Sequence, residues 1–164
     1  MTKRRGKGYK LDWKGPEVQK KFTEAVAEGF VDFALTVEKN AKAELYKGHG
    51  VVTGTLRRSI HIAQDGYNWS GDNVEPKGGG RNTKGQFTAG APERGGKRVS
   101  ALGRNGKLLL QVGSGMVYAL WVEMGGQGFA GYRYLRNGLA KTKPMLRDFL
   151  KRRVERVFKK SKKK

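Results

Sequence analysis

The longest periodic run of apolar residues lies within 17–46. Its apolar positions recur at spacings of three or four residues: Phe22, Val26, Phe30, Phe33, Val37 and Ala41. Such spacing places these side chains in one stripe along a helix. Pro16 suits the first turn of this helix, and Gly48 and Gly50 indicate its end. We therefore expect a helix over 17–46, about 45 Å long.

The pattern changes to that of short strands after this helix. Thr53 can cap a new helical turn, and residues 59–63 then alternate polar and apolar side chains before a turn at Asp65-Gly66. A second strand is expected within residues 107–115, which carry three leucines and a valine.

The last part of the chain is helical again in its patterning. Residues 116–126, "MVYALWVEMGG", suit a short helix that stops at Gly125 and Gly126, and Pro144 suits the start of a final amphipathic helix. Together these elements predict an α+β fold. We expect the long N-terminal helix and the C-terminal helix to pack on a small antiparallel sheet.

Composition divides the chain further. Its 164 residues argue for one domain. Residues 64–107 are rich in glycine and cations, which predicts a long basic loop or β-arm inserted into the domain. We expect a flexible basic arm over 1–15, a single α+β domain over 16–158, and a basic tail over 159–164.

Charge is the dominant feature of the composition. The chain has 35 Lys and Arg against 14 Asp and Glu, a net charge of +21. This excess predicts attraction to polyanions, although basic ends can equally be solvated segments that keep a protein in solution. The candidate contacts to DNA or to a partner lie in the arm and the glycine-rich loop: Lys3, Arg4, Arg5, Lys84, Arg94, Lys97 and Arg98.

Residues for catalysis are sparse. The chain has no cysteine and only two histidines, His49 and His61, and its acidic residues are scattered. No spacing resembles a metal site or an acid/base pair. We expect no enzymatic activity and no cofactor. The apolar runs are also shorter than the roughly 18–20 residues of a membrane span, so we expect no membrane partner.

Three short segments stand out for their order along the chain. They are "VVTGTLRRSI", "VGSGMVYALWVEMGG" and "YRYLRNGL". The set resembles the tail-completion, or neck, proteins of long-tailed bacteriophages, the minor tail protein Z-like family. The matching positions are Thr53, Gly54, Leu56, Arg57, Ser59, Ile60, Gly113, Ser114, Tyr118, Ala119, Val122, Glu123, Gly125, Tyr134, Leu135, Arg136 and Leu139.

The resemblance implies a structural virion protein. Its copies would form a ring, with six as the expected number, that joins the head connector to the tail tube and lets genomic DNA pass. The partners would be connector or stopper proteins and tail-terminator or tail-tube proteins. The protein would reside in the virion, and in the host cytoplasm during assembly. Three departures are Gly126, where relatives commonly have threonine, the absence of prolines around the third segment, and the unusually long, basic insertion at 64–107.

In that setting we expect the residues of the first segment to have separate roles. Gly54 lets the chain turn after the long helix. Leu56 and Ile60 dock on the core, and Arg57 and Arg58 remain for partners. We hypothesise that Glu123 pairs with one of these arginines, within a protomer or across a subunit boundary.

A second interpretation stays open from the residues alone. Basic segments interleaved with aromatic residues can contact phosphates and bases, which is typical of a stand-alone nucleic-acid-binding protein. The aromatic residues concerned are Tyr9, Trp13, Trp69, Phe87, Phe129, Tyr132 and Tyr134. The same residues could instead belong to a core or to a subunit interface.

Overall fold

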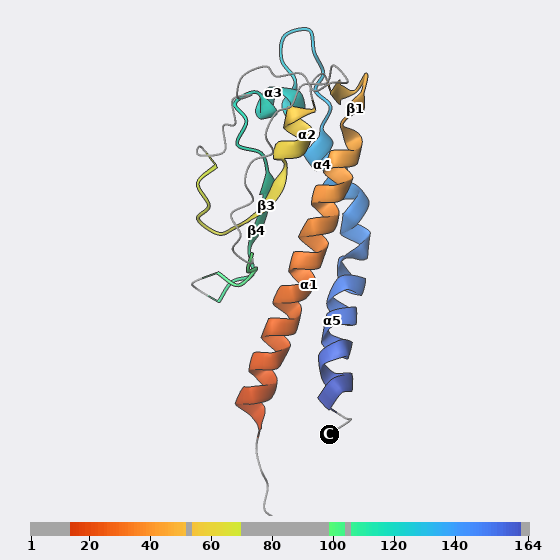
Figure 1. The fold of residues 1–164 in the computed structure, drawn as a ribbon. Helices are drawn as coiled ribbons and strands as arrows, with labels where there is room; N and C mark the ends of the chain where they lie inside the picture. Colours follow the sequence, from red (N-terminus) through yellow and green to blue (C-terminus); the bar gives the residue numbers. More distant parts are fainter. Residues whose placement is uncertain (1–13, 52–53, 70–98, 104–105, 162–164) are drawn as a thin grey trace, which may run out of the picture.

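The computed structural model describes residues 14–51, 54–69, 99–103 and 106–161, and it confirms the α+β fold. A long helix, a C-terminal helix and a small antiparallel sheet are all present (Figure 1). The elements are α1 (Gly15–Glu44), β1 (Tyr46–Lys47), β2 (Gly50–Val51), α2 (Thr55–Ser59), β3 (His61–Gln64), β4 (Leu110–Gly113), α3 (Ala119–Met124), α4 (Tyr134–Thr142), the 3₁₀ helix η2 (Lys143–Met145) and α5 (Leu146–Ser161).

Helix α1 is the longest element, with 30 residues, and its presence is predicted by the apolar spacing. It has Pro16 in its first turn but ends at Glu44, so the expected glycine stop is wrong. Leu45, the next residue, has an extended backbone and is fully buried in the core cluster at this end. The buried positions of α1 are only partly the predicted stripe: Ala25, Gly29, Ala34, Val37, Glu38 and Ala41.

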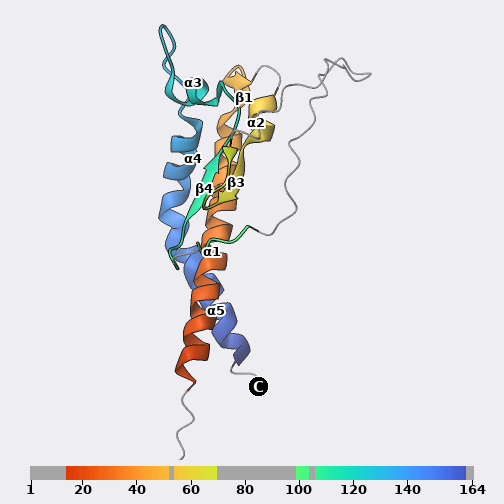
Figure 2. The same ribbon diagram turned by 90° about the vertical axis from the view of Figure 1, so that its left-hand side faces the viewer.

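Small residues on α1 are buried because two other helices approach it closely. A Cβ added at Gly29 would lie 2.9 Å from the Leu150 side chain of α5. A Cβ added at Gly138 of α4 would lie 2.7 Å from the backbone nitrogen of Ala41. Helices α4 and α5 therefore run antiparallel to α1 along most of its length (Figures 1 and 2).

Helix α4 was not expected from the pattern, whereas the final amphipathic helix is present as α5, directly after the turn that contains Pro144. Pro144 lies in η2, which connects α4 to α5. Near this junction the Thr142 hydroxyl accepts a 2.8 Å hydrogen bond from the Asn40 amide of α1 and donates to the Gly138 carbonyl. The C-terminal region is thus two helices joined end to end on the same face of α1.

The antiparallel sheet is shorter than predicted. Strands β3 and β4 pair from His61 opposite Gly113 to Gln64 opposite Leu110, and both contact α1 (Figure 2). Ser59 belongs to α2 rather than to a strand, because its hydroxyl bonds the Leu56 carbonyl within that helix. The turn at Gly66 is present, with φ of +75°.

The main cluster of buried apolar residues lies where α1 ends and α2, α3 and α4 begin. Its members are Ala41, Leu45, Leu56, Ile60, Met116, Ala119 and Tyr134. Most of the expected basic arm, residues 70–98 and 104–105 of the glycine-rich insertion, and the last residues of the tail lie outside the described residues. The domain boundaries proposed from composition stay predictions.

Candidate assembly interface

The three sequence segments that carry the family resemblance meet at one end of the molecule. The hydroxyl of Ser59, from the first segment, lies 2.6 Å from the hydroxyl of Ser114, from the second. The Ser114 hydroxyl also accepts a hydrogen bond from the backbone N–H of Met116. The two segments are therefore joined by a polar contact directly beside the core.

Tyr118 makes a second link between these segments. Its hydroxyl accepts a hydrogen bond from the backbone N–H of Leu56, in the first turn of α2. This N–H has no partner within the helix, so the tyrosine satisfies it. Burial raises the pKa of Tyr118 above its ordinary value, while the Leu56 N–H and the charge of Arg58 oppose that rise. Gly54 precedes α2 with φ of +75°, a conformation that favours glycine.

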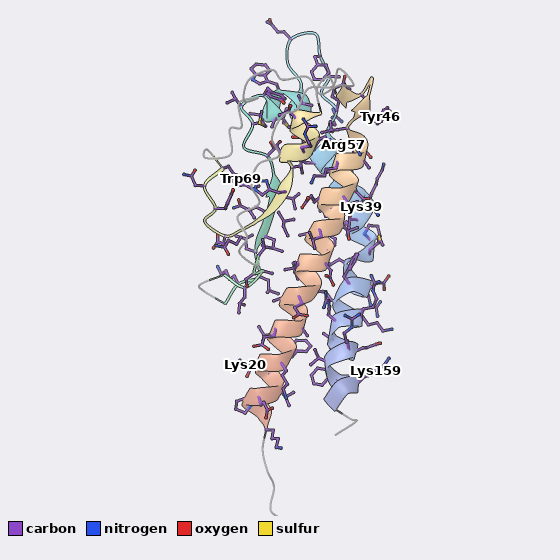
Figure 3. All side chains as sticks on the ribbon, viewed as in Figure 1. Lys20, Lys39, Tyr46, Arg57, Trp69 and Lys159 are labelled. Carbon is purple, nitrogen blue, oxygen red and sulfur yellow. The ribbon has the colours of Figure 1, made fainter. Side chains whose placement is uncertain are left out.

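Glu123 links the second segment to the third, and its partners differ from our hypothesis. Its carboxylate accepts hydrogen bonds of 2.8 and 3.2 Å from the backbone N–H groups of Leu135 and Arg136, in the first turn of α4. A negative charge at this position also complements the helix dipole. The expected pairing with Arg57 or Arg58 within one chain is therefore wrong. Both arginines are exposed on α2, and Figure 3 labels Arg57 there.

The loop between α3 and α4 depends on two glycines. Gly125 and Gly131 have φ of +86° and +70°, and a Cβ on either would lie 2.3–2.4 Å from the backbone around the other. The loop closes through the pair Gly126 and Phe129, whose backbone groups bond each other. Two backbone N–H groups then return to α3, that of Tyr132 to Val122 and that of Arg133 to Glu123. The glycine of the Glu-x-Gly segment is thus required by backbone contact.

Tyr134 anchors the third segment. Its ring is fully buried, and its hydroxyl donates a 3.4 Å hydrogen bond to the carbonyl of Ala119. Burial raises its pKa above the ordinary tyrosine value, with the charge of Glu123 acting in the same direction. Leu135 packs against the same cluster, whereas Arg136 is exposed and its guanidinium approaches the Met124 sulfur at 3.8 Å.

An apolar face is exposed to solvent where the three segments meet. Val117, Leu120, Trp121 and Met124 are 75%, 68%, 63% and 58% exposed. They are spaced i, i+3, i+4 and i+7, so they occupy one side of α3 and of the turn before it. The neighbouring loop adds Phe129, which is 41% exposed. We call these five residues the α3 apolar face. Its spacing was visible in the sequence, but only the fold shows that it points away from the core.

A second distinctive surface lies on α5. Exposed cations follow one another along this helix and the turn before it: Lys143, Arg147, Lys151, Arg152, Arg156 and Lys159 (Figure 3 labels Lys159). Arg153 is different, because it lies at the seam with α1. There it bonds both carboxylate oxygens of Asp32, at 2.5 and 2.8 Å, and pairs with Glu28 at 3.0 Å.

Among the candidate residues, Thr53 and the seven expected contacts to DNA or partners lie outside the described residues. Those seven are Lys3, Arg4, Arg5, Lys84, Arg94, Lys97 and Arg98. Trp69 is one of the aromatic residues suggested to contact bases. In the structure it packs on the sheet beside His61 and Gly113, and its ring nitrogen donates a hydrogen bond to the Gln111 side chain. Within the described ranges no cluster of three or more His, Asp or Glu is placed to hold a metal ion.

No helix in the described part of the chain is long and apolar enough to span a bilayer. Comparison of the chain with family models, with curated proteins and with solved structures finds no match.

Proposed function

We propose that this protein is a structural component of a phage neck or tail, in which its copies form a ring between the head connector and the tail tube. The observation that carries the proposal is the convergence of the three motif segments. Ser59 meets Ser114, Tyr118 meets α2, and Glu123 meets α4, so residues scattered over the sequence form one connected unit. That unit supports an outward apolar face, as expected of an assembly protein.

The charge of the chain also supports assembly with other proteins. Six copies would carry six times +21, or +126. A ring as tall as α1 is long, about 45 Å, would enclose only about 26 DNA phosphates at roughly one charge per 1.7 Å. DNA in the lumen would therefore balance a minority of the cations. The remainder would face solvent or acidic surfaces on neighbouring rings.

The test is a reconstruction of purified particles from cells that produce this chain, with the chain identified by mass spectrometry. The proposal expects stoichiometric chain in the particles and a closed ring at the head–tail joint. Absence of the chain from purified, DNA-filled particles would refute it.

One observation favours a second function, that of a stand-alone nucleic-acid-binding protein. The exposed cations of α5 form a surface suited to phosphate contacts. Such a protein would bind duplex DNA in dilute solution with a steep dependence on salt. A neck protein would need its partners to assemble and would show no requirement for tight binding of free DNA.

A further inference from the structure

The apolar face of α3 has a border of positive charge. The Arg136 guanidinium approaches Met124, the backbone N–H of Arg133 bonds the Glu123 carbonyl of α3, and Arg58 lies near Tyr118, the residue after Val117. All three arginines are exposed. Within the described residues the structure records no ion pair for any of them. We call these three residues the arginine rim.

One carboxylate, that of Glu123, lies beside the start of α4 near Arg136. Glu123 directs both carboxylate oxygens to backbone N–H groups at the start of α4. Three exposed arginines against this one carboxylate leave the rim with a net positive charge. The surface thus combines an apolar centre with a cationic border, which selects a partner by both shape and charge.

We infer that the α3 apolar face and its arginine rim bind an acidic protein surface with an apolar centre, and not a second copy of this chain. The inference names the partner chemistry for the proposed neck protein and rests on that function for its biological setting. The physical argument is charge complementarity. Two α3 faces in symmetrical contact would place Arg58, Arg133 and Arg136 of one copy against those of the other, which opposes binding.

Another surface of a second copy is also a poor match, because most described carboxylates already have partners. Glu17 pairs with Lys21, Glu38 with Lys42, Glu44 with Lys141, Glu155 with Lys151 and Lys159, and Asp32 and Glu28 with Arg153. The described acids for which no ion pair is recorded are Glu24, Asp65, Glu123 and Asp148, and they lie on separate elements. The described residues therefore offer no concentrated acidic patch to the arginine rim.

The test uses three synthetic helical peptides as probes, followed by fluorescence anisotropy. The first has leucines and a tryptophan at i, i+3, i+4 and i+7 with glutamate elsewhere. The second keeps the apolar positions but replaces glutamate by lysine, and the third contains glutamate without the apolar positions. The inference expects the first peptide to bind at least about tenfold more tightly than the other two. Equal binding of the first and second peptides, or no binding of the first, overturns it.

Variants then locate the binding surface. Leu120→Ser and Val117→Ser remove highly exposed apolar groups, so the fold should be retained, and each should weaken binding of the first peptide about tenfold. Arg136→Gln should weaken it severalfold and reduce its dependence on salt. Leu109→Ser, on an exposed apolar residue before β4, and Lys151→Gln, on α5, are matched controls that should leave binding unchanged. Unchanged binding by both α3 variants overturns the inference.

The molecular mass of the protein in solution shows whether a second copy of the chain, and not another protein, covers the α3 apolar face. If the wild-type protein self-associates and Leu120→Ser makes it monomeric, the face is a contact between copies and the inference is wrong. Failure of the proposed function looks different: the chain would be absent from particles while the peptide and variant results persisted. Conversely, a chain found in the neck ring with peptide binding insensitive to Leu120 would refute this inference alone.

Discussion

The α3 end of the molecule and the α1–α5 pair satisfy their polar groups by different means. At the α3 end, side chains such as Glu123 and Tyr118 bond backbone N–H groups, and apolar side chains are left outside. Along α1 and α5, carboxylates pair with cations at the helix seam, and surplus cations are left outside. The contacts at the α3 end fix the backbone, whereas the ion pairs along α1 and α5 join only side chains. Substitutions at the α3 end should therefore lower the free energy of unfolding more than substitutions along α1 and α5.

The largest effect should come from the loop at the α3 end. Gly131→Ala would place a Cβ about 2.4 Å from the backbone nitrogen of Gly125, at a positive φ. Strain and overpacking together should lower the free energy of unfolding by about 3 kcal/mol or more, measured by denaturant titration.

Gly128→Ala is the matched control for that loop. Gly128 also has a positive φ, of +75°, but no atom lies within 4 Å of its added Cβ. It should cost only about 1–2 kcal/mol. Equal losses for the two variants would show that the Gly125–Gly131 contact does not constrain the loop.

Glu123→Ala should come next. It removes the acceptor for two N–H groups at the start of α4, so the free energy of unfolding should fall by about 1–2 kcal/mol. Arg57→Ala and Arg58→Ala should each change it by less than about 0.5 kcal/mol. If an arginine variant matched the loss at Glu123 and failed to add to it in the double variant, an ion pair would explain the loss better.

Loss of the ion pair between α1 and α5 should lower the free energy of unfolding by a smaller amount, and this effect should depend on pH. Hydrogen bonds from Arg153 lower the pKa of Asp32 below its ordinary value of 3.8, against the opposing effect of burial. A lowered folded-state pKa means that the unfolded chain binds more protons in this range. The stabilisation should therefore be complete above about pH 5 and disappear as the pH falls through 3.8 and below.

Asp32→Asn tests this dependence by unfolding at several pH values. Both partners are partly exposed, so the variant should lose about 1 kcal/mol or less at pH 7. The difference from the wild type should close in acid. A difference that stayed constant from pH 7 to about 2 would contradict the assignment to the Asp32 carboxylate.

The smallest effect on stability should come from the outer face of α5. Lys151→Gln combined with Arg156→Gln should change the free energy of unfolding by less than about 0.5 kcal/mol. The same pair should reduce the salt dependence of any duplex binding, measured by anisotropy on a short duplex. A large stability loss would show that these cations belong to the folded framework after all.

The sequence predicted the elements whose signals are local. The apolar spacing of α1 and the short helix α3 before Gly125 were both recognisable from patterning. Helix α4 was missed because it has only nine residues and contains Gly138, a poor helix former. It is held by contacts from elsewhere, namely Gly138 against Ala41 and Glu123 at its first turn.

The candidate site was predicted in its residues but not in its contacts. Order along the chain identified Ser59, Tyr118 and Glu123 as members of one set, yet their partners are partly backbone groups. Residue types do not reveal which backbone N–H is left unsatisfied, so an arginine seemed the natural partner of Glu123. The outward direction of the α3 apolar face was hidden for the same reason, because direction depends on tertiary packing.

Amide hydrogen exchange on the chain, free in solution and within purified particles, tests the account most directly. We predict that assembly adds protection across 117–131, where the α3 apolar face lies, in addition to any change on α5. Protection gained on α5 alone, with 117–131 exchanging as in the free chain, would contradict the assignment of this face to assembly.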